Sequence, residues 1–118
     1  MANILIIDHD AIEAAMEEAV LEQKGYTVHV ERDGAAALAS IAARWPRLVV
    51  LDPNHEVGVE AVHAACEAGD GRARTPLLLV SNPYEGASLG GDALAEGALV
   101  HPFTGADLTA AITKLLEG

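Results

Sequence analysis

Cysteine is almost absent from this chain of 118 residues, which contains only Cys66. One cysteine cannot form an internal disulfide, so the sequence excludes a disulfide-stabilised domain. Cys66 lies in an alanine-rich stretch with helical spacing, and a free cysteine in such a stretch usually behaves as a small buried hydrophobe. We therefore expect a structural role for this thiol.

Basic residues and long apolar runs are also scarce. Lys and Arg number 7 against 18 Asp and Glu, which gives a net charge of −11. This balance repels phosphate backbones and anionic lipids, so we expect neither nucleic acid nor a membrane as a direct partner. No apolar run approaches the ~18 residues of a transmembrane helix, and the start MANILIIDHD lacks the basic lead of a signal peptide. We expect a cytoplasmic protein.

The motifs of common enzyme classes are missing as well. No Cys-His or Ser-His-Asp pattern is evident, and Ser81 stands in VSN rather than in a nucleophile elbow. The acidic stretch DHDAIE follows the first apolar run, where a nucleotide-binding fold would have a glycine-rich loop. These absences disfavour a general enzyme and a nucleotide-binding protein.

What the chain does have is a regular alternation of short apolar runs and helical patterns. About half of the residues are apolar, enough for one globular domain over residues 1–118. The runs are residues 4–7, 28–30, 48–51, 77–80 and 98–100. The first, third and fourth are continuous, which is typical of strands that are buried on both faces. The order predicts an α/β fold: a doubly wound, five-stranded parallel sheet of order 2-1-3-4-5, flavodoxin-like (βα)5.

Helical spacing fills the intervals between these strands. We expect helices after Asp10 and after Asp33-Gly34, one that contains Val59, Val62 and Cys66, and a last one capped by Thr104. Residues 84–97 contain four glycines, each costing about 1 kcal/mol inside a helix, so we expect a short or mobile fourth helix there.

Polar side chains follow the strands at the edge where the parallel strands end. They are Asp8, His9 and Asp10 after the first strand, Asp52, Asn54 and His55 after the third, Ser81 after the fourth and His101 after the fifth. Ligands of doubly wound folds bind at this edge. Neighbouring carboxylates repel unless a cation lies between them, and Mg²⁺ prefers such oxygen ligands. Asp8 and Asp10 could simply cap a helix, but that reading does not explain Asp52 at the end of a buried strand.

Four stretches give this pattern a family likeness: ILIIDHD, RLVVLDPN, TPLLLVSN and EGALVHPF. Together they resemble the receiver domain of two-component response regulators (CheY-like) over essentially the whole chain. The resemblance implies that Asp52 accepts a phosphoryl group and that Ser81 and the residue at position 101 contact it. It also implies a metal site of Asp8, His9, Asp10, Asp52 and the backbone carbonyl of Asn54. The family's phosphodonors are histidine kinases and phosphotransfer proteins.

The sequence departs from the family at four points. His9 replaces the second acid of the metal-binding pair, and imidazole is a poor ligand for Mg²⁺ but a good one for Zn²⁺. His101 replaces a lysine that would pair with the phosphorylated aspartate, and an imidazole is mostly neutral at pH 7. Ala98 stands where the family has a switch aromatic. The loop over residues 52–58 is shorter than usual and lacks a Met-Pro pair. The chain resembles a divergent, atypical receiver.

Three functional hypotheses remain open. The first is a single-domain response regulator that is phosphorylated at Asp52, has no output domain in this chain, and acts through a downstream protein partner. The second is a pseudo-receiver, an interaction module that is not phosphorylated. The third is a transition-metal site of Asp8, His9, Asp52 and His101, which His55 could join. The expected cofactor is accordingly Mg²⁺, whose binding His9 would weaken, a transition metal such as Zn²⁺, or none. We expect no catalysis beyond self-phosphorylation of Asp52 from a phosphodonor, and a homodimer is possible.

Overall fold

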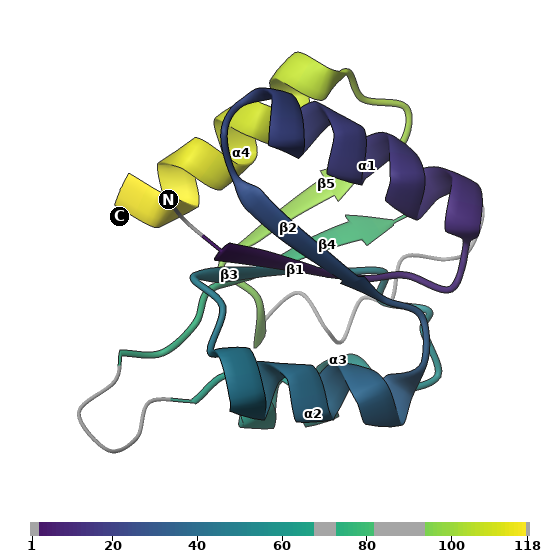
Figure 1. Cartoon of the computed structure of the whole chain (residues 1–118), viewed down its shortest axis with the longest axis vertical. Coiled ribbons are helices and arrows are strands. Elements are labelled where there is room, and N and C mark those ends of the chain that lie inside the picture. Colours follow the sequence, from purple (N-terminus) through teal and green to yellow (C-terminus); the bar gives the residue numbers. More distant parts are fainter. Residues whose placement is uncertain (1–2, 68–72, 82–93, 118) are drawn as a thin grey trace.

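The computed structural model describes residues 3–67, 73–81 and 94–117, and its centre is one parallel sheet (Figure 1). The strands are β1 (Asn3–Ile7), β2 (Thr27–Glu31), β3 (Leu48–Leu51), β4 (Leu77–Ser81) and β5 (Gly97–Val100). They pair in the order β2-β1-β3-β4-β5, and all four pairings are parallel. The predicted fold class and strand order are confirmed.

Four helices of the described residues cover the two faces of the sheet. They are α1 (Ala11–Gln23), α2 (Gly34–Arg44), α3 (Val59–Ala65) and α4 (Gly105–Glu117). Figure 1 shows α1 and α4 on one face and α2 and α3 on the other, which makes the arrangement doubly wound. The expected fourth helix within residues 84–97 falls mostly on residues 82–93, which lie outside the described part. Within that part, no helix has the length and apolar character to span a membrane.

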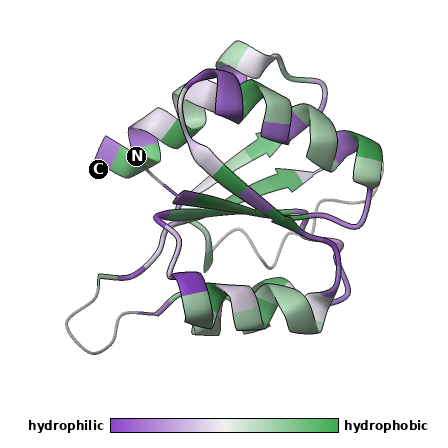
Figure 2. Cartoon of the chain, viewed as in Figure 1, coloured by the Kyte–Doolittle hydropathy of each residue, from purple (hydrophilic) through white to green (hydrophobic). Residues whose placement is uncertain are grey.

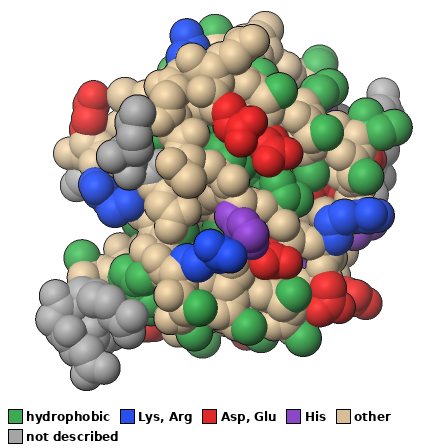
Figure 3. All heavy atoms as spheres, in the orientation of Figure 1, with side chains coloured by type: hydrophobic (Ala, Val, Ile, Leu, Met, Phe, Trp, Pro, Cys, Tyr) green, Lys and Arg blue, Asp and Glu red, His purple; other side chains and the backbone are tan. Residues whose placement is uncertain are grey.

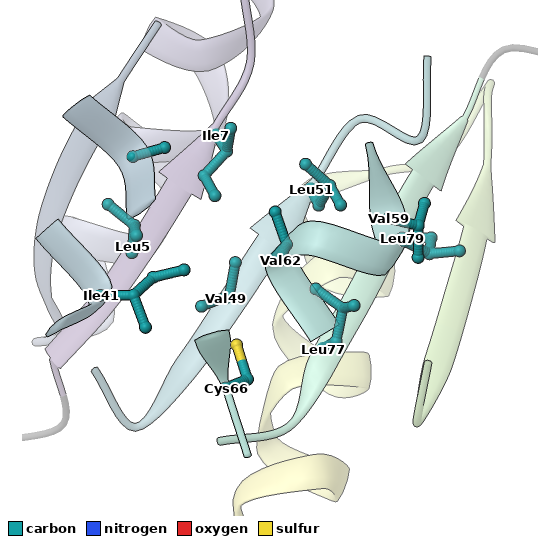
Figure 4. Packing of buried hydrophobic residues seen from close by; sticks show 11 residues of the cluster. Leu5, Ile7, Ile41, Val49, Leu51, Val59, Val62, Cys66, Leu77 and Leu79 are labelled. Atoms are coloured by element: carbon teal, nitrogen blue, oxygen red, sulfur yellow. The ribbon is translucent and has the colours of Figure 1, made fainter. Parts of the chain in front are cut away.

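The sheet has an apolar core on each face. Figure 4 shows one of them, where Leu5, Val49 and Leu77 of the strands meet Ile41 of α2 and Val62 of α3. Cys66 belongs to the same cluster and is fully buried, and this burial raises the pKa of its thiol to about 11. In Figure 2 the sheet is accordingly the most hydrophobic part of the ribbon. The expected structural role of Cys66 agrees with this environment.

Capping side chains set the beginnings of three helices. The predicted cap of α4 is confirmed, because the Thr104 hydroxyl accepts a hydrogen bond from the Asp107 amide at 3.0 Å. The carboxylate of Asp10 accepts hydrogen bonds from the amides of Ile12 and Glu13, and that of Asp33 accepts one from Ala36. Such caps satisfy amide groups that have no partner within the helix, and each stabilises it by about 1 kcal/mol. Asp10 thus has a sufficient structural function, whatever else it does.

The buried face of α1 differs from the face that its apolar spacing suggests. Ile12 and Met16 are exposed, at 77% and 59%, whereas Ala14, Glu17 and Leu21 are buried. The apolar residues and the buried residues of α1 both repeat with helical spacing, but they lie on different faces of the helix. Packing against β2 and α4, rather than hydropathy alone, decides which face of α1 is turned inward.

Strand register brings the predicted site residues to one edge. Ile7 pairs with Leu51, Leu51 with Leu79, and Ser81 with Val100. The residues that follow β1, β3 and β5 therefore lie near the end of β4, at the carboxyl edge of the sheet.

Candidate phosphoacceptor and cation site

Asp52 follows β3 directly and is held in place by its backbone and its side chain. Its amide donates to the carbonyl of Ile7 at 3.1 Å, and its Oδ1 accepts a hydrogen bond from the amide of Asn54 at 2.9 Å. The side chain is only 12% exposed. One carboxylate oxygen is thus fixed by the loop, and Oδ2 is directed toward another group.

Asp8 is a second, more deeply buried carboxylate at the end of β1. Its Oδ1 accepts a hydrogen bond from the amide of Asp10 at 2.9 Å, and the residue is 3% exposed. Burial raises the pKa of Asp8 to about 6, and the nearby Glu13 carboxyl adds to the rise, against the lowering effect of the Asp10 amide. A carboxyl group in this state is a site where a cation would restore the charged form.

His9 completes a cluster with these two acids. Its Nδ1 lies 3.8 Å from Oδ2 of Asp52, while the side chain is 63% exposed. Single ligand atoms of Asp8, His9 and Asp52 all lie within 4.8 Å of one another. Arg32 donates to the carbonyl of His9 at 3.1 Å, which places a guanidinium at the same edge. This cluster offers two carboxylates and an imidazole to one cation.

His55, which was a possible further metal ligand, has a different place in the structure. It is buried; its Nδ1 accepts from the amide of Val57 at 3.0 Å, and its Nε2 lies 2.7 Å from the carbonyl of Arg32. Because Nδ1 accepts, Nε2 must carry the proton and donate. Both nitrogens are therefore used to tie the loop after β3 to the loop after β2. The ring contacts that of His9 edge-on, at 5.9 Å between centroids.

The remaining predicted residues, Asp10, Asn54, Ser81 and His101, lie around the cluster of Asp8, His9 and Asp52, and each makes different contacts. The Asp10 carboxylate is directed at the start of α1, as described above. Asn54 is exposed, and its backbone fixes Asp52. Ser81 is 8% exposed at the end of β4, and its carbonyl accepts a hydrogen bond from the His101 amide at 3.0 Å. Ser81 and His101 are thus at the predicted edge.

The side chain of His101 turns toward α1. Its Nε2 is hydrogen-bonded to Oε1 of Glu13, and its ring packs on Phe103 with centroids 4.5 Å apart. The ligand atoms that cluster with His101 are those of Glu13 and Glu17, separately from the Asp8, His9 and Asp52 cluster. His101 and Asp52 nevertheless line the same cleft.

That cleft has a volume of about 400 Å³ and is lined by His9, Asp10, Ile12, Glu13, Met16, Asp52 and His101. A larger cleft, of about 770 Å³, lies at the opposite edge of the sheet, around Trp45, Arg74 and Glu96. The larger one contains none of the predicted residues. On the face seen in Figure 3, charged side chains of both signs are scattered rather than gathered in one basic patch.

Glu13 and Glu17 were missed by reasoning from the sequence. Their spacing of four places them on one face of α1, and that spacing could have signalled a pair. The signal was hidden because the apolar residues of α1 suggested a different buried face. Only the packing shows that Glu17 is inside, at 3% exposure.

Comparisons with known proteins agree with the observed fold. No protein-family model matches the chain. The transcriptional regulatory protein PrrA of Mycobacterium tuberculosis is 34% identical over 117 residues, which are 98% of this chain and 50% of that protein. The nitrogen assimilation regulatory protein NtrX of Azorhizobium caulinodans is 42% identical over 50 residues, which are 42% of this chain and 11% of that protein. The chain spans about half the length of the PrrA proteins.

Solved structures show the same architecture. The chemotaxis response regulator CheY4 of Vibrio cholerae superposes with a TM-score of 0.79 at 27% identity, over 98% of both chains. A CheY-like receiver domain protein of Methanospirillum hungatei gives a TM-score of 0.83 at 22% identity, over 99% of this chain and 94% of that chain. At that identity the second likeness shows the fold alone. With the curated relatives, which match 98% of this chain, these findings show that the chain belongs to the CheY-like receiver domains of two-component response regulators.

Proposed function

We propose that this receiver domain accepts a phosphoryl group on Asp52 and signals through protein contacts. The observation that carries the proposal is the position of the Asp52 carboxylate: it lines an open cleft, with Oδ1 fixed by the Asn54 amide and Oδ2 directed at His9. A nucleophile that is held by a hydrogen bond and accessible from one side suits in-line attack on a phosphoryl donor.

The transfer itself needs no further oxidant or reductant. An Asp52 oxygen forms a bond to phosphorus as the donor's phosphohistidine N–P bond breaks, and the electron pair of that bond returns to the imidazole. The product is an acyl phosphate that carries about two negative charges. His9, when protonated, and the guanidinium of Arg32 are positive groups at this edge that would stabilise the added charge.

Receiver domains bind Mg²⁺, and the oxygen donors at this edge fit such an ion. Asp8 and Asp52 would supply carboxylates and Asn54 its backbone carbonyl, while the buried Asp8 would regain its charged form. A bound cation would offset negative charge on the phosphoryl oxygens. The imidazole of His9 fits less well, because hard cations prefer oxygen ligands. We therefore propose that this site binds Mg²⁺ more weakly than it would with a carboxylate at position 9.

Apolar side chains beside the cleft support a protein as the phosphodonor. Ile12 and Met16 line the cleft and are largely exposed. Exposed apolar groups next to a reactive site are typical of a docking surface. We propose that a histidine kinase or phosphotransfer protein binds there.

A second candidate, an unphosphorylated interaction module, is favoured by one observation. The His101 imidazole is bonded to Glu13, so it is not available to pair with a phosphoryl group in this arrangement. In addition, Ala98 on the edge strand β5 is exposed and has no ring to move when Asp52 changes. A module of this kind would keep the fold and its contacts without the chemistry.

Incubation with a small phosphodonor and Mg²⁺, followed by intact mass spectrometry, separates the two candidates. Phosphorylation predicts the gain of one phosphoryl mass, its loss in Asp52→Asn, and its retention in Asp33→Asn. The Asp33→Asn control removes a carboxylate of the same type but keeps the helix cap, since Asn caps as well as Asp. An unchanged mass with a donor that phosphorylates another receiver would establish the second candidate.

A further inference from the structure

A second cluster of metal-ligand side chains lies beside the first and includes residues that the proposed phosphorylation does not use. Glu13 and Glu17 are one helical turn apart on α1, and His101 comes from the loop between β5 and α4. One ligand atom from each lies within 4.8 Å of the others. The cluster therefore joins two segments that are 84 or more positions apart in the sequence.

Glu17 is the unusual member of this cluster. It is only 3% exposed, and neither of its carboxylate oxygens has a hydrogen-bond partner among the described residues. Buried polar groups in proteins are almost always hydrogen-bonded, because an unsatisfied one costs free energy. Its carboxylate points at Glu13 and His101, so the missing partner would lie between the three side chains.

Protonation alone does not remove this difficulty. Burial and the nearby acids, Glu13 first among them, raise the pKa of Glu17 to about 8, so the free protein holds a neutral carboxyl group there. A neutral carboxyl still has an O–H donor and a carbonyl acceptor that need partners in a buried site. A cation would satisfy both oxygens and offset the repulsion between the two glutamates.

The kind of donor points to the kind of cation. One imidazole nitrogen and two carboxylates form a common ligand set for Zn²⁺, usually with a water as the fourth ligand. Atoms that are about 2.1 Å from one ion are no more than about 4.2 Å apart, so a modest rotation of the glutamates closes the site. His101 and Glu13 already face each other through their hydrogen bond.

An ion can reach this position from solvent. Glu13 and His101 both line the open cleft of about 400 Å³, and their side chains are 21% and 28% exposed. Glu17 lies behind them. An entering ion would thus meet Glu13 and His101 first and the buried Glu17 last.

We propose that Glu13, Glu17 and His101 bind a zinc-like divalent cation, at a site distinct from the Asp8, His9 and Asp52 cluster. The bound ion would tie α1 to the segment that follows β5. This proposal does not depend on phosphorylation of Asp52, and each can fail without the other.

Zinc titration of tag-free, chelator-treated protein tests the site, with calorimetry and the thermal midpoint as readouts. We expect the full chain to bind Zn²⁺ and to unfold at a higher temperature when zinc is present, because a ligand that binds only the folded state stabilises it. Glu17→Gln, which keeps the side-chain volume, should weaken this binding by more than about tenfold and remove the thermal shift.

Variants of the two clusters distinguish the sites. His9→Ala, which alters only the first cluster, should leave the Glu17-dependent binding and thermal shift in place. Glu13→Gln, at a more accessible position, should weaken binding like Glu17→Gln, and it keeps the test valid if the buried variant folds poorly. No zinc binding by the unaltered chain, or zinc binding by Glu17→Gln and Glu13→Gln as tight as that of the unaltered chain, would overturn the proposal. Loss of all binding in His9→Ala would also overturn it.

Discussion

His101 is hydrogen-bonded to Glu13, whereas the imidazole that faces Asp52 is that of His9, whose Nδ1 is 3.8 Å from Oδ2. The two histidines at the carboxyl edge of the sheet thus belong to different clusters. One stands beside the proposed phosphoacceptor, and the other joins β5 to α1.

His9→Asp should restore a hard oxygen ligand beside Asp8 and Asp52. We expect Mg²⁺ to bind about tenfold more tightly, a change of about 1.4 kcal/mol, and phosphorylation by a small donor to become faster at low Mg²⁺. His9→Asn is the control, since it removes the imidazole without adding charge. Equal Mg²⁺ affinity in His9→Asp and the unaltered chain, measured by calorimetry, would show that position 9 does not contact the ion.

Glu17→Gln should stabilise the metal-free protein, measured by denaturant unfolding in the presence of a chelator. The groups around Glu17 are Asp8, Asp10, Glu13 and Asp52, and His101 from the segment after β5. The pKa of Glu17 is about 8 when folded and 4.5 in its ordinary state, so only the unfolded chain gains by ionising between these values. The loss of folding stability caused by Glu17 is therefore absent below pH 4.5, grows as the pH rises and is complete above pH 8.

The variant's advantage should therefore grow from pH 5 to pH 8 and reach on the order of 1–3 kcal/mol. Glu18→Gln, one position along the same helix, serves as control, because a change at a partly exposed site alters stability by no more than about 0.5 kcal/mol. A pH-independent difference between Glu17→Gln and the unaltered chain would contradict the assigned burial.

His55→Ala should destabilise the fold by about 1–3 kcal/mol, because it leaves the amide of Val57 and the carbonyl of Arg32 without their partners. The same change should slow phosphorylation, since the loop that carries Asp52 loses its tie to the loop after β2. His9→Ala provides the comparison for stability: its side chain is 63% exposed, and we expect a loss below about 0.5 kcal/mol. Similar unfolding midpoints for the two variants would refute the structural role of His55.

Asp10 offers a test of capping against metal binding. Asp10→Ala should cost about 1 kcal/mol, because the amides of Ile12 and Glu13 lose their acceptor. Asp10→Asn should keep that stability, and it should also keep divalent-cation affinity if the carboxylate only caps α1. A marked fall in affinity for Asp10→Asn at unchanged stability would assign Asp10 to the metal site.

The sequence was sufficient to predict the fold and the edge at which the candidate site residues gather. Continuous apolar runs such as residues 48–51 belong to strands that are covered on both faces, and the alternation with helices leaves one common topology. That topology places Asp8, Asp52, Ser81 and His101 at one edge without knowledge of any side-chain contact.

Side-chain partners within that edge depend on packing and could not be predicted in the same way. The orientation of α1 about its own axis places Glu17 inside and Ile12 outside, although hydropathy favours the reverse. His101 then meets Glu13 because α1 presents it there. His55 likewise has a side chain that could bind a metal, but both of its ring nitrogens are hydrogen-bonded to backbone groups.

The most direct test of the central claim is to locate the phosphoryl group after reaction with a small phosphodonor and Mg²⁺. Peptide mapping by mass spectrometry, with hydroxylamine to identify an acyl phosphate, reports the residue that carries it. We predict a hydroxylamine-sensitive phosphoryl group on the peptide that contains Asp52, and on no other peptide. A phosphoryl group on a different residue, or none under conditions that phosphorylate another receiver domain, would contradict the account.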